Sequence, residues 1–132
     1  MFLLKQWNNQ VRIVRVLFFV SLVSLIVSGC SNGMTTGNPT PKDMLKNGDA
    51  DIFLLEDIVY ANAQDIEWVQ DTYYTLGNQV GEITKQKVSA FNFNNGTASK
   101  LPVGTKIYAT GKGFYVAVVD GTEIPYIKLL EG

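Results

Sequence analysis

Hydrophobic residues are distributed in two different ways along this chain of 132 residues. From Val16 to Val27 they form an almost unbroken run that is interrupted only by serine. From Asp49 onward they form short runs that are separated by Gly, Asn, Asp or Pro. Short apolar runs between turn residues are typical of strands. The pattern therefore predicts an N-terminal hydrophobic segment followed by a small domain rich in strands.

The clearest strand pattern lies at the C-terminal end. Gly111-Lys112-Gly113 separates the first two of three apolar runs, and Asp120-Gly121 separates the last two. An Asp-Gly pair favours a two-residue hairpin turn, because both turn positions need φ > 0. The predicted strands are Thr105–Thr110, Phe114–Val119 and Thr122–Leu130. Phe114–Val119 is apolar on both faces, so we expect it to be a central strand.

Weaker patterns precede these strands. A helix is expected from Ala63 to Asp71, with Asn62 as its N-cap and with Ile66, Val69 and Tyr73 on its buried face. Asn94-Asn95-Gly96 is expected to form a turn, and Pro125, which has no amide donor, is expected at a sheet edge or a bulge. Further strands are predicted at Ile52–Leu55, Ile58–Tyr60, Gln79–Lys85 and Val88–Phe93.

These elements predict a mainly β fold with six or seven short strands and one short helix. A small antiparallel barrel or a strongly curved sheet is the expected architecture, since closure removes strand edges that could aggregate. An SH3-like barrel would be one such fold, by analogy.

The N-terminal hydrophobic segment has the layout of an export signal. Lys5, Arg12 and Arg15 precede the apolar run, and the small residues Ser28 and Gly29 follow it. Directly after them comes Cys30, the only cysteine of the chain. A buried cysteine behind a hydrophobic helix and an uncleaved membrane anchor are the alternatives. The apolar run is shorter than the about 20 residues of a membrane-spanning helix, which argues against an uncleaved membrane anchor.

Val27-Ser28-Gly29-Cys30 resembles the lipobox of bacterial lipoproteins. The resemblance implies that a diacylglyceryl group is attached to the Cys30 sulfur and that the Gly29–Cys30 bond is then cut. A thiolate is a strong nucleophile near neutral pH, which suits this alkylation. The expected organisation is a signal peptide over 1–29, a flexible tether over 30–48 and a mainly β domain over 49–132. The lipid would hold the protein on the outer face of a cell membrane.

The charge of the expected mature chain limits its partners. All twelve acidic residues lie after residue 29, whereas three of the eleven basic residues lie before it, so the net charge is 8 − 12, or −4. Nucleic acid is an unsuitable partner, because phosphate binding needs a basic surface. The same charge argues against electrostatic adhesion to anionic lipid headgroups, so we expect the lipid on Cys30 to hold the protein at the membrane. We expect a monomer without a disulfide and without a cofactor.

Catalytic chemistry has few candidates in this sequence. The chain has no histidine, which removes the usual general base and the commonest metal ligand. Paired carboxylates could still act, as in glycosidases. The candidates are Glu56 with Asp57, and Asp65 with Glu67 and Asp71. A solvated hairpin turn and an acidic first helical turn explain these two groups more simply.

Two further motifs are weak. Asp49 and Asp51 alternate as calcium ligands do, but the later ligands of an EF-hand loop are missing, so no metal site is predicted. Asn95-Gly96-Thr97 matches a glycosylation acceptor, yet the lipobox indicates a bacterium and a turn is the simpler interpretation.

The aromatic residues offer a better candidate site. Most of them are expected in the core, but Trp68 lies off the apolar stripe of the predicted helix, and Tyr74 follows six residues later. An exposed Trp beside a Tyr could stack on sugar rings or anchor a protein partner. Trp68 and Tyr74 are therefore the predicted binding patch.

Two segments, Leu101–Tyr108 and Ile124–Gly132, are similar to the ends of small, uncharacterised envelope lipoproteins of Gram-positive, Firmicute-type bacteria. The resemblance implies no active site. We expect a non-enzymatic, lipid-anchored domain that binds an envelope protein, a peptide or a wall polymer. The alternative is a small wall-active or sugar-cleaving enzyme that uses paired carboxylates. A Gram-positive and a diderm envelope both remain open.

Overall fold

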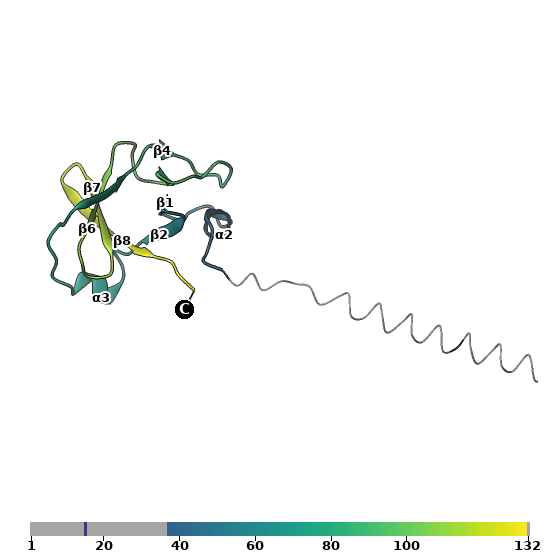
Figure 1. The fold of residues 1–132 in the computed structure, drawn as a ribbon, viewed down its shortest axis with the longest axis horizontal. Helices are drawn as coiled ribbons and strands as arrows, with labels where there is room; N and C mark the ends of the chain where they lie inside the picture. Colours follow the sequence, from purple (N-terminus) through teal and green to yellow (C-terminus); the bar gives the residue numbers. More distant parts are fainter. Residues whose placement is uncertain (1–14, 16–36, 132) are drawn as a thin grey trace, which may run out of the picture. The chain divides into compact units, whose positions relative to one another are not determined.

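The computed structural model describes Arg15 and residues 37–131, and the latter form a mainly β domain (Figure 1). The helices are α2 (Pro41–Leu45) and α3 (Glu67–Gln70). The strands are β1 (Ile52–Leu55), β2 (Ile58–Asn62), β3 (Gln79–Glu82), β4 (Lys85–Gln86), β5 (Thr97–Ala98), β6 (Lys106–Ala109), β7 (Tyr115–Val119) and β8 (Thr122–Lys128). The prediction of a mainly β, strongly curved sheet is confirmed, with one more helix and at least one more strand than expected.

All of these strands belong to one curled sheet with the order β3-β6-β7-β8-β2-β1-β5-β4. The two outermost strands, β3 and β4, are consecutive in the chain and are joined by only Ile83 and Thr84. The sheet therefore curls into a half-barrel, and its opposite edges are brought close together by this short connection. Neighbouring strands are antiparallel except for β4 and β5, which form a parallel pair of two residues each.

Apolar side chains fill the inside of the half-barrel and cover its outside in two places. The inner cluster contains Phe53, Tyr60, Ile107 and Tyr126, all of them buried. A second cluster covers the outer face of β1 and β2, and a third covers the outer face of β7 under α3. In β7, Val116 and Ala117 point to opposite faces and both are fully buried. The prediction that this strand is central is confirmed.

Two of the predicted hairpin turns are present, and the positive φ predicted for Asp120-Gly121 is found at the central residues of both. Glu56 and Asp57 join β1 to β2 with φ of 50° and 62°. Asp120 and Gly121 join β7 to β8 with φ of 49° and 80°. Positive φ at both central residues is the type I′ geometry that suits the twist of a hairpin. The turn at 94–96 is also present, since the amide of Thr97 donates to the carbonyl of Asn94.

The strand predicted at Val88–Phe93 is wrong. These residues form a loop, in which Phe91 is exposed whereas Phe93 is buried. Phe93 is held by an apolar cluster that includes Met44 and Leu45 of α2, a contact between distant segments that local alternation does not reveal. The strand predicted at Gln79–Lys85 is also divided, because the chain passes from one edge of the sheet to the other at Ile83 and Thr84.

The helix predicted at Ala63–Asp71 is shorter than expected. It covers only Glu67–Gln70, and its N-cap is Ile66 instead of Asn62. The Asn62 side chain instead accepts a hydrogen bond of 2.8 Å from the amide of Gln64 and so stabilises a turn before the helix. Val69 is buried as predicted, but the chain leaves the helix before Tyr73, which is exposed.

Pro125 lies in an internal strand and in a regular register with Val116, whereas a sheet edge or a bulge was predicted. β8 pairs with β7 on one side and with β2 on the other. The ladder between β2 and β8 ends at the pair Asn62 and Tyr126, and Tyr126 is the residue directly after the proline. The carbonyl of Pro125 accepts a hydrogen bond from the amide of Ala63. Because the β2 ladder ends at Asn62, the amide hydrogen that proline lacks is not needed for pairing with β2.

Residues 37–48, which belong to the expected tether, contact the domain. Thr40 and Asp43 form a capping box that starts α2, and the hydrogen bonds from Thr40 lower the pKa of the Asp43 carboxyl. Met44 and Leu45 pack against the outer cluster of β1 and β2. The amide of Gly37 donates to Oε2 of Glu131 over 2.9 Å. Among the described residues, helices of the length and hydropathy needed to cross a bilayer are absent.

Candidate functional site

Trp68 and Tyr74 meet at one buried ring, that of Phe114. The Trp68 ring centroid lies 6.0 Å from that of Phe114 at an interplanar angle of 66°, and the Tyr74 centroid lies 5.2 Å away at 86°. Both are edge-to-face contacts, the arrangement that aromatic quadrupoles favour. Trp68 remains 50% exposed, whereas Phe114 is 3% exposed. The residues of the predicted patch therefore lie together; we call Trp68, Phe114 and Tyr74 the aromatic surface.

Local backbone geometry places these rings. α3 buries Val69 and thereby turns the preceding Trp68 outward. Gly113 has a φ of 90°, so the chain bends sharply just before Phe114 and β7. A Cβ atom at Gly113 would lie 3.9 Å from the Trp68 ring, which shows that the ring extends over this glycine. The sequence predicts Phe114 only as part of a strand. Its contact with both Trp68 and Tyr74 joins segments that are distant in the sequence, so the residue pattern does not reveal it.

Tyr74 is fixed by a second contact. Its hydroxyl donates a hydrogen bond of 2.8 Å to Oε2 of Glu123 on β8. Burial, and then the interaction with Glu123, raise the pKa of the Tyr74 hydroxyl. Trp68 is therefore the exposed member of the aromatic surface, and Tyr74 is a supporting member held against the sheet.

A pocket of about 210 Å³ adjoins the aromatic surface. Gly113 and Phe114 belong to both, and the pocket is also lined by Tyr60, Tyr115 and Lys128. The rings of Tyr60 and Tyr115 are stacked, with centroids 4.9 Å apart and an interplanar angle of 15°. Burial, and then the neighbouring Tyr115, raise the pKa of the Tyr60 hydroxyl. Sequence reasoning did not connect these residues.

The chemistry of this pocket suits a polar group on an extended ligand. Two phenols and one ammonium group offer hydrogen-bond donors, and the adjoining rings offer apolar faces. The volume is below the about 300–1,000 Å³ typical of small-molecule sites. A ligand that uses it must therefore make most of its contacts outside the pocket, on surfaces such as Trp68.

The candidate catalytic carboxylates lie elsewhere. Glu56 and Asp57 are exposed at the β1–β2 turn, where the Asp57 amide donates to Oδ1 of Asn95 over 2.8 Å. Asp65, Glu67 and Asp71 are exposed around α3. Carboxylates line neither of the two pockets described here.

Asp49 and Asp51, the weak calcium-ligand candidates, make separate contacts with other residues of the domain. Asp49 forms an ion pair of 3.0 Å with Lys100. Asp51 accepts hydrogen bonds of 2.8 Å from the Tyr126 hydroxyl and from the Asn62 side chain. Within residues 37–131, groups of three or more potential metal ligands are absent. Asn95-Gly96-Thr97 lies at the turn into β5, with Thr97 buried.

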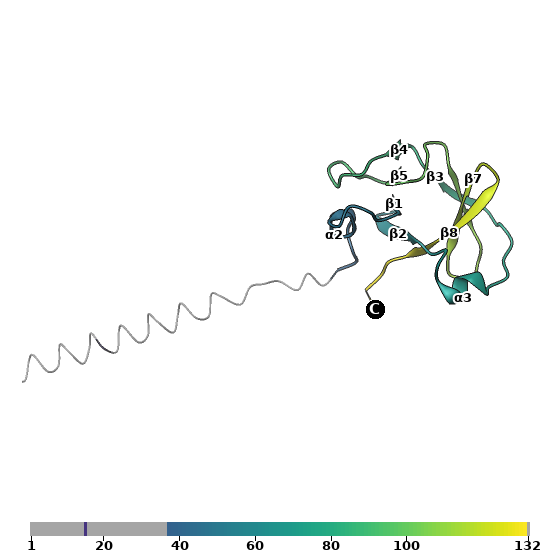
Figure 2. The ribbon, with the colours of Figure 1, turned by 180° about the vertical axis from the view of Figure 1, so that it is seen from behind.

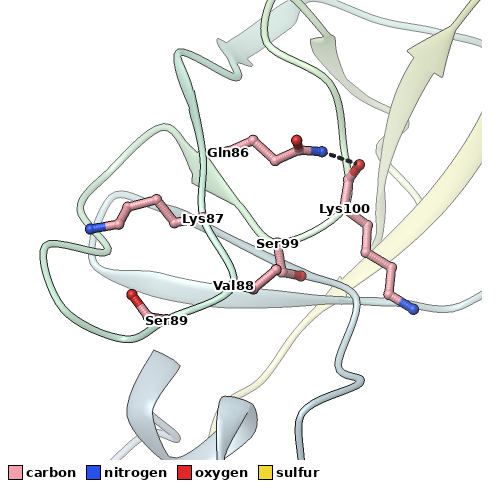
Figure 3. Close-up of a pocket in the computed structure, with 6 residues that line it drawn as sticks. All are labelled: Gln86, Lys87, Val88, Ser89, Ser99 and Lys100. Atoms are coloured by element: carbon pink, nitrogen blue, oxygen red, sulfur yellow. Dashed lines mark hydrogen bonds between the residues drawn. The ribbon is translucent and has the colours of Figure 1, made fainter.

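A second, more open pocket of about 600 Å³ lies between the segment after β4 and the segment after β5. Figure 3 shows the residues that line it, Gln86, Lys87, Val88, Ser89, Ser99 and Lys100. The Gln86 side chain donates a hydrogen bond of 2.7 Å to the carbonyl of Lys100 and so ties the two walls together.

The predicted lipidation site, Cys30, and the cleavage position at Gly29 lie outside the described residues. Comparisons of the chain with protein-family models, with curated proteins and with solved structures found no match.

Proposed function

We propose that this chain is a lipid-anchored, extracytoplasmic binding domain of a bacterial envelope, and that it binds an extended wall polymer through the aromatic surface and the adjoining pocket. The lipobox-like residues Val27–Cys30 support the anchor. The observation that carries the binding role is the half-exposed Trp68, held in place by Phe114 beside a pocket with polar donors.

The shape of the site favours a polymer over a small molecule. An exposed tryptophan ring provides a flat apolar platform, and sugar rings have apolar faces that stack on such platforms. Lys128 and the phenols of Tyr60 and Tyr115 can receive a carboxylate or a hydroxyl group in the pocket. Peptidoglycan combines sugar rings with peptide carboxylates, so its chemistry fits both parts of the site.

Cosedimentation with purified peptidoglycan tests this function. The mature protein should pellet with it, and Trp68→Ala should weaken binding by about tenfold or more, as truncation of an exposed anchor residue does. Trp68 is half-exposed, so its loss should leave the melting temperature nearly unchanged. Lys128→Glu, in the lining of the pocket, should weaken binding as well.

Val103→Ala is the matched control, because Val103 is 63% exposed and lies outside both the aromatic surface and the pocket. Its binding should equal that of the wild type. Equal binding by the wild type and Trp68→Ala would contradict the assignment of the aromatic surface, whether or not Lys128→Glu weakens binding.

A further inference from the structure

The segment that contains β4 and β5 is rich in lysine. From Ile83 to Val119 the sequence has five lysines and no acidic residue, although the mature chain as a whole is acidic. In the loop after β4, the apolar side chains of Val88 and Phe91 are each 77% exposed. An exposed phenylalanine at a loop tip next to lysines is the combination seen in proteins that lie at a membrane surface.

The lysine side chains here are directed outward over a broad area. Figure 3 shows the ammonium groups of Lys87 and Lys100 extending away from each other on either side of the open pocket. They therefore cannot enclose one small anion together. Their spacing suits several separate negative groups, such as the headgroups of a lipid layer.

Lys87 is also joined to the exposed ring of Phe91. Its Nζ lies 5.3 Å from the ring centroid and donates a hydrogen bond to the Phe91 carbonyl. A cation held over an apolar ring can stay at the level of the lipid headgroups while the ring enters the layer beneath them.

Helix α2 lies beside this loop and adds further lysines. The loop residue Phe93 packs in one cluster with Met44 and Leu45 of α2. Lys42 of α2 and Lys46, the C-cap directly after it, are exposed. Figures 1 and 2 both place α2 and the loop after β4 at the same end of the domain. We call the surface formed by Lys42, Lys46, Lys87, Val88, Phe91 and Lys100 the lysine face. Asp43 lies on α2 beside it and Asp49 pairs with Lys100 over 3.0 Å, so four lysines and two carboxylates leave this end of the domain with a charge of 4 − 2, or +2.

The position of the lipid attachment brings this face to the bilayer. Gly37, which is hydrogen-bonded to the domain shortly before α2, lies seven positions after Cys30 in the sequence. A chain of that length spans at most about 25 Å when fully extended. Under the proposed function, on which this step rests, the end of the domain that carries α2 lies within that reach of the membrane.

We propose that the lysine face lies on anionic lipid headgroups, with Val88 and Phe91 inserted among them. The aromatic surface then faces away from the bilayer, because α3 lies at the opposite end of the domain from the loop after β4 (Figures 1 and 2). The net charge of −4 does not oppose this contact, because screening limits the effect of distant charges to about 10 Å. The anchor thus sets the location, and the lysine face sets the orientation.

Site-directed spin labelling of the lipidated protein in vesicles tests the orientation. With Cys30 acylated, the mature chain has no other thiol, so Val88→Cys and Tyr73→Cys each provide a single labelling site. In vesicles that contain phosphatidylglycerol, the label at 88 should be protected severalfold from an aqueous nickel chelate and accessible to oxygen. The label at 73, where the native side chain is 86% exposed near α3, should remain aqueous.

Charge reversal separates the contact from the anchor. Lys46→Glu with Lys87→Glu should return the label at 88 to water, whereas Lys106→Glu with Lys112→Glu, outside the lysine face, should leave it protected. Equal aqueous exposure at 88 and 73 in protein that floats with the vesicles would overturn the proposed orientation and leave the anchor intact. Mature protein without lipid would overturn both proposals.

Discussion

The Tyr126 hydroxyl donates a hydrogen bond of 2.8 Å to Oδ1 of Asp51, across 75 residues of the sequence. Tyr126 is fully buried inside the half-barrel and its ring packs 5.0 Å from that of Phe53. Asn62 donates to the other carboxylate oxygen of Asp51. The start of β1, the end of β2 and the middle of β8 are therefore fastened together at one carboxylate.

Tyr126→Phe should destabilise the domain by about 1.5–3 kcal/mol, the usual effect of losing a hydrogen bond to a charged group. Chemical denaturation at neutral pH measures this difference. Tyr73→Phe is the matched control and should leave stability unchanged, because Tyr73 is 86% exposed. Equal losses for the two variants would show that the bond to Asp51 contributes nothing.

Stability should also fall in alkaline solution. Burial raises the pKa of Tyr60 and of Tyr126 above the ordinary value of 10.0, so the folded state holds both phenols neutral. The unfolded chain releases these protons near that value, and it then binds fewer protons than the folded chain. The stability from these groups is therefore complete below pH 10 and is lost progressively above it. Denaturation curves recorded from about pH 7 to about pH 12 should show this decline, and Tyr126→Phe should reduce its slope.

Thr97 carries a buried hydroxyl without a hydrogen-bond partner in the part of the chain that the structure describes. Thr97→Val removes the unpaired group and should stabilise the domain by about 1 kcal/mol. Thr105 is similarly buried, but its hydroxyl donates to the Pro102 carbonyl over 2.7 Å. Thr105→Val should therefore destabilise the domain by about 1 kcal/mol. Thermal melts that shift in the same direction for both variants would contradict this difference.

Gly121→Val should cost about 1–3 kcal/mol, because a β-branched residue is strained at the φ of 80° found there. The space around a Cβ atom at this position is open, so the loss would report backbone strain alone. Gly37→Val makes the same change where the space is also open and φ is not positive, and it should have little effect. Melting temperatures decide the matter: an unchanged value for Gly121→Val would contradict the type I′ turn.

The features that the sequence predicted well depend on neighbouring residues. The Asp120-Gly121 turn follows from the φ values that two adjacent residues can adopt, and β7 was predicted as central because its apolar residues are consecutive. The loop at 88–93 was predicted as a strand because Phe91 and Phe93 alternate. Phe93 is buried there by α2, about fifty residues earlier in the chain, and local periodicity does not report such a contact.

The same distinction applies to the candidate site. Trp68 was recognised because it lies off a local apolar stripe, and the structure confirms that it is half-exposed. Its packing partner Phe114 comes from the other end of the domain, and so do Tyr115 and Lys128 of the adjoining pocket. A residue pattern predicts exposure on one element, but the assembly of a site from distant elements depends on how the whole sheet curls.

The mass of the N-terminal peptide of the protein purified from membranes tests the central proposal most directly. A lipid-anchored domain requires that the mature chain begin at Cys30 and carry a diacylglyceryl thioether, whose two acyl chains hold it on the bilayer. Mass spectrometry should therefore find this modified peptide in the wild type, and Cys30→Ala should yield only uncleaved precursor without lipid. An unmodified Cys30 in the wild-type protein would contradict the account.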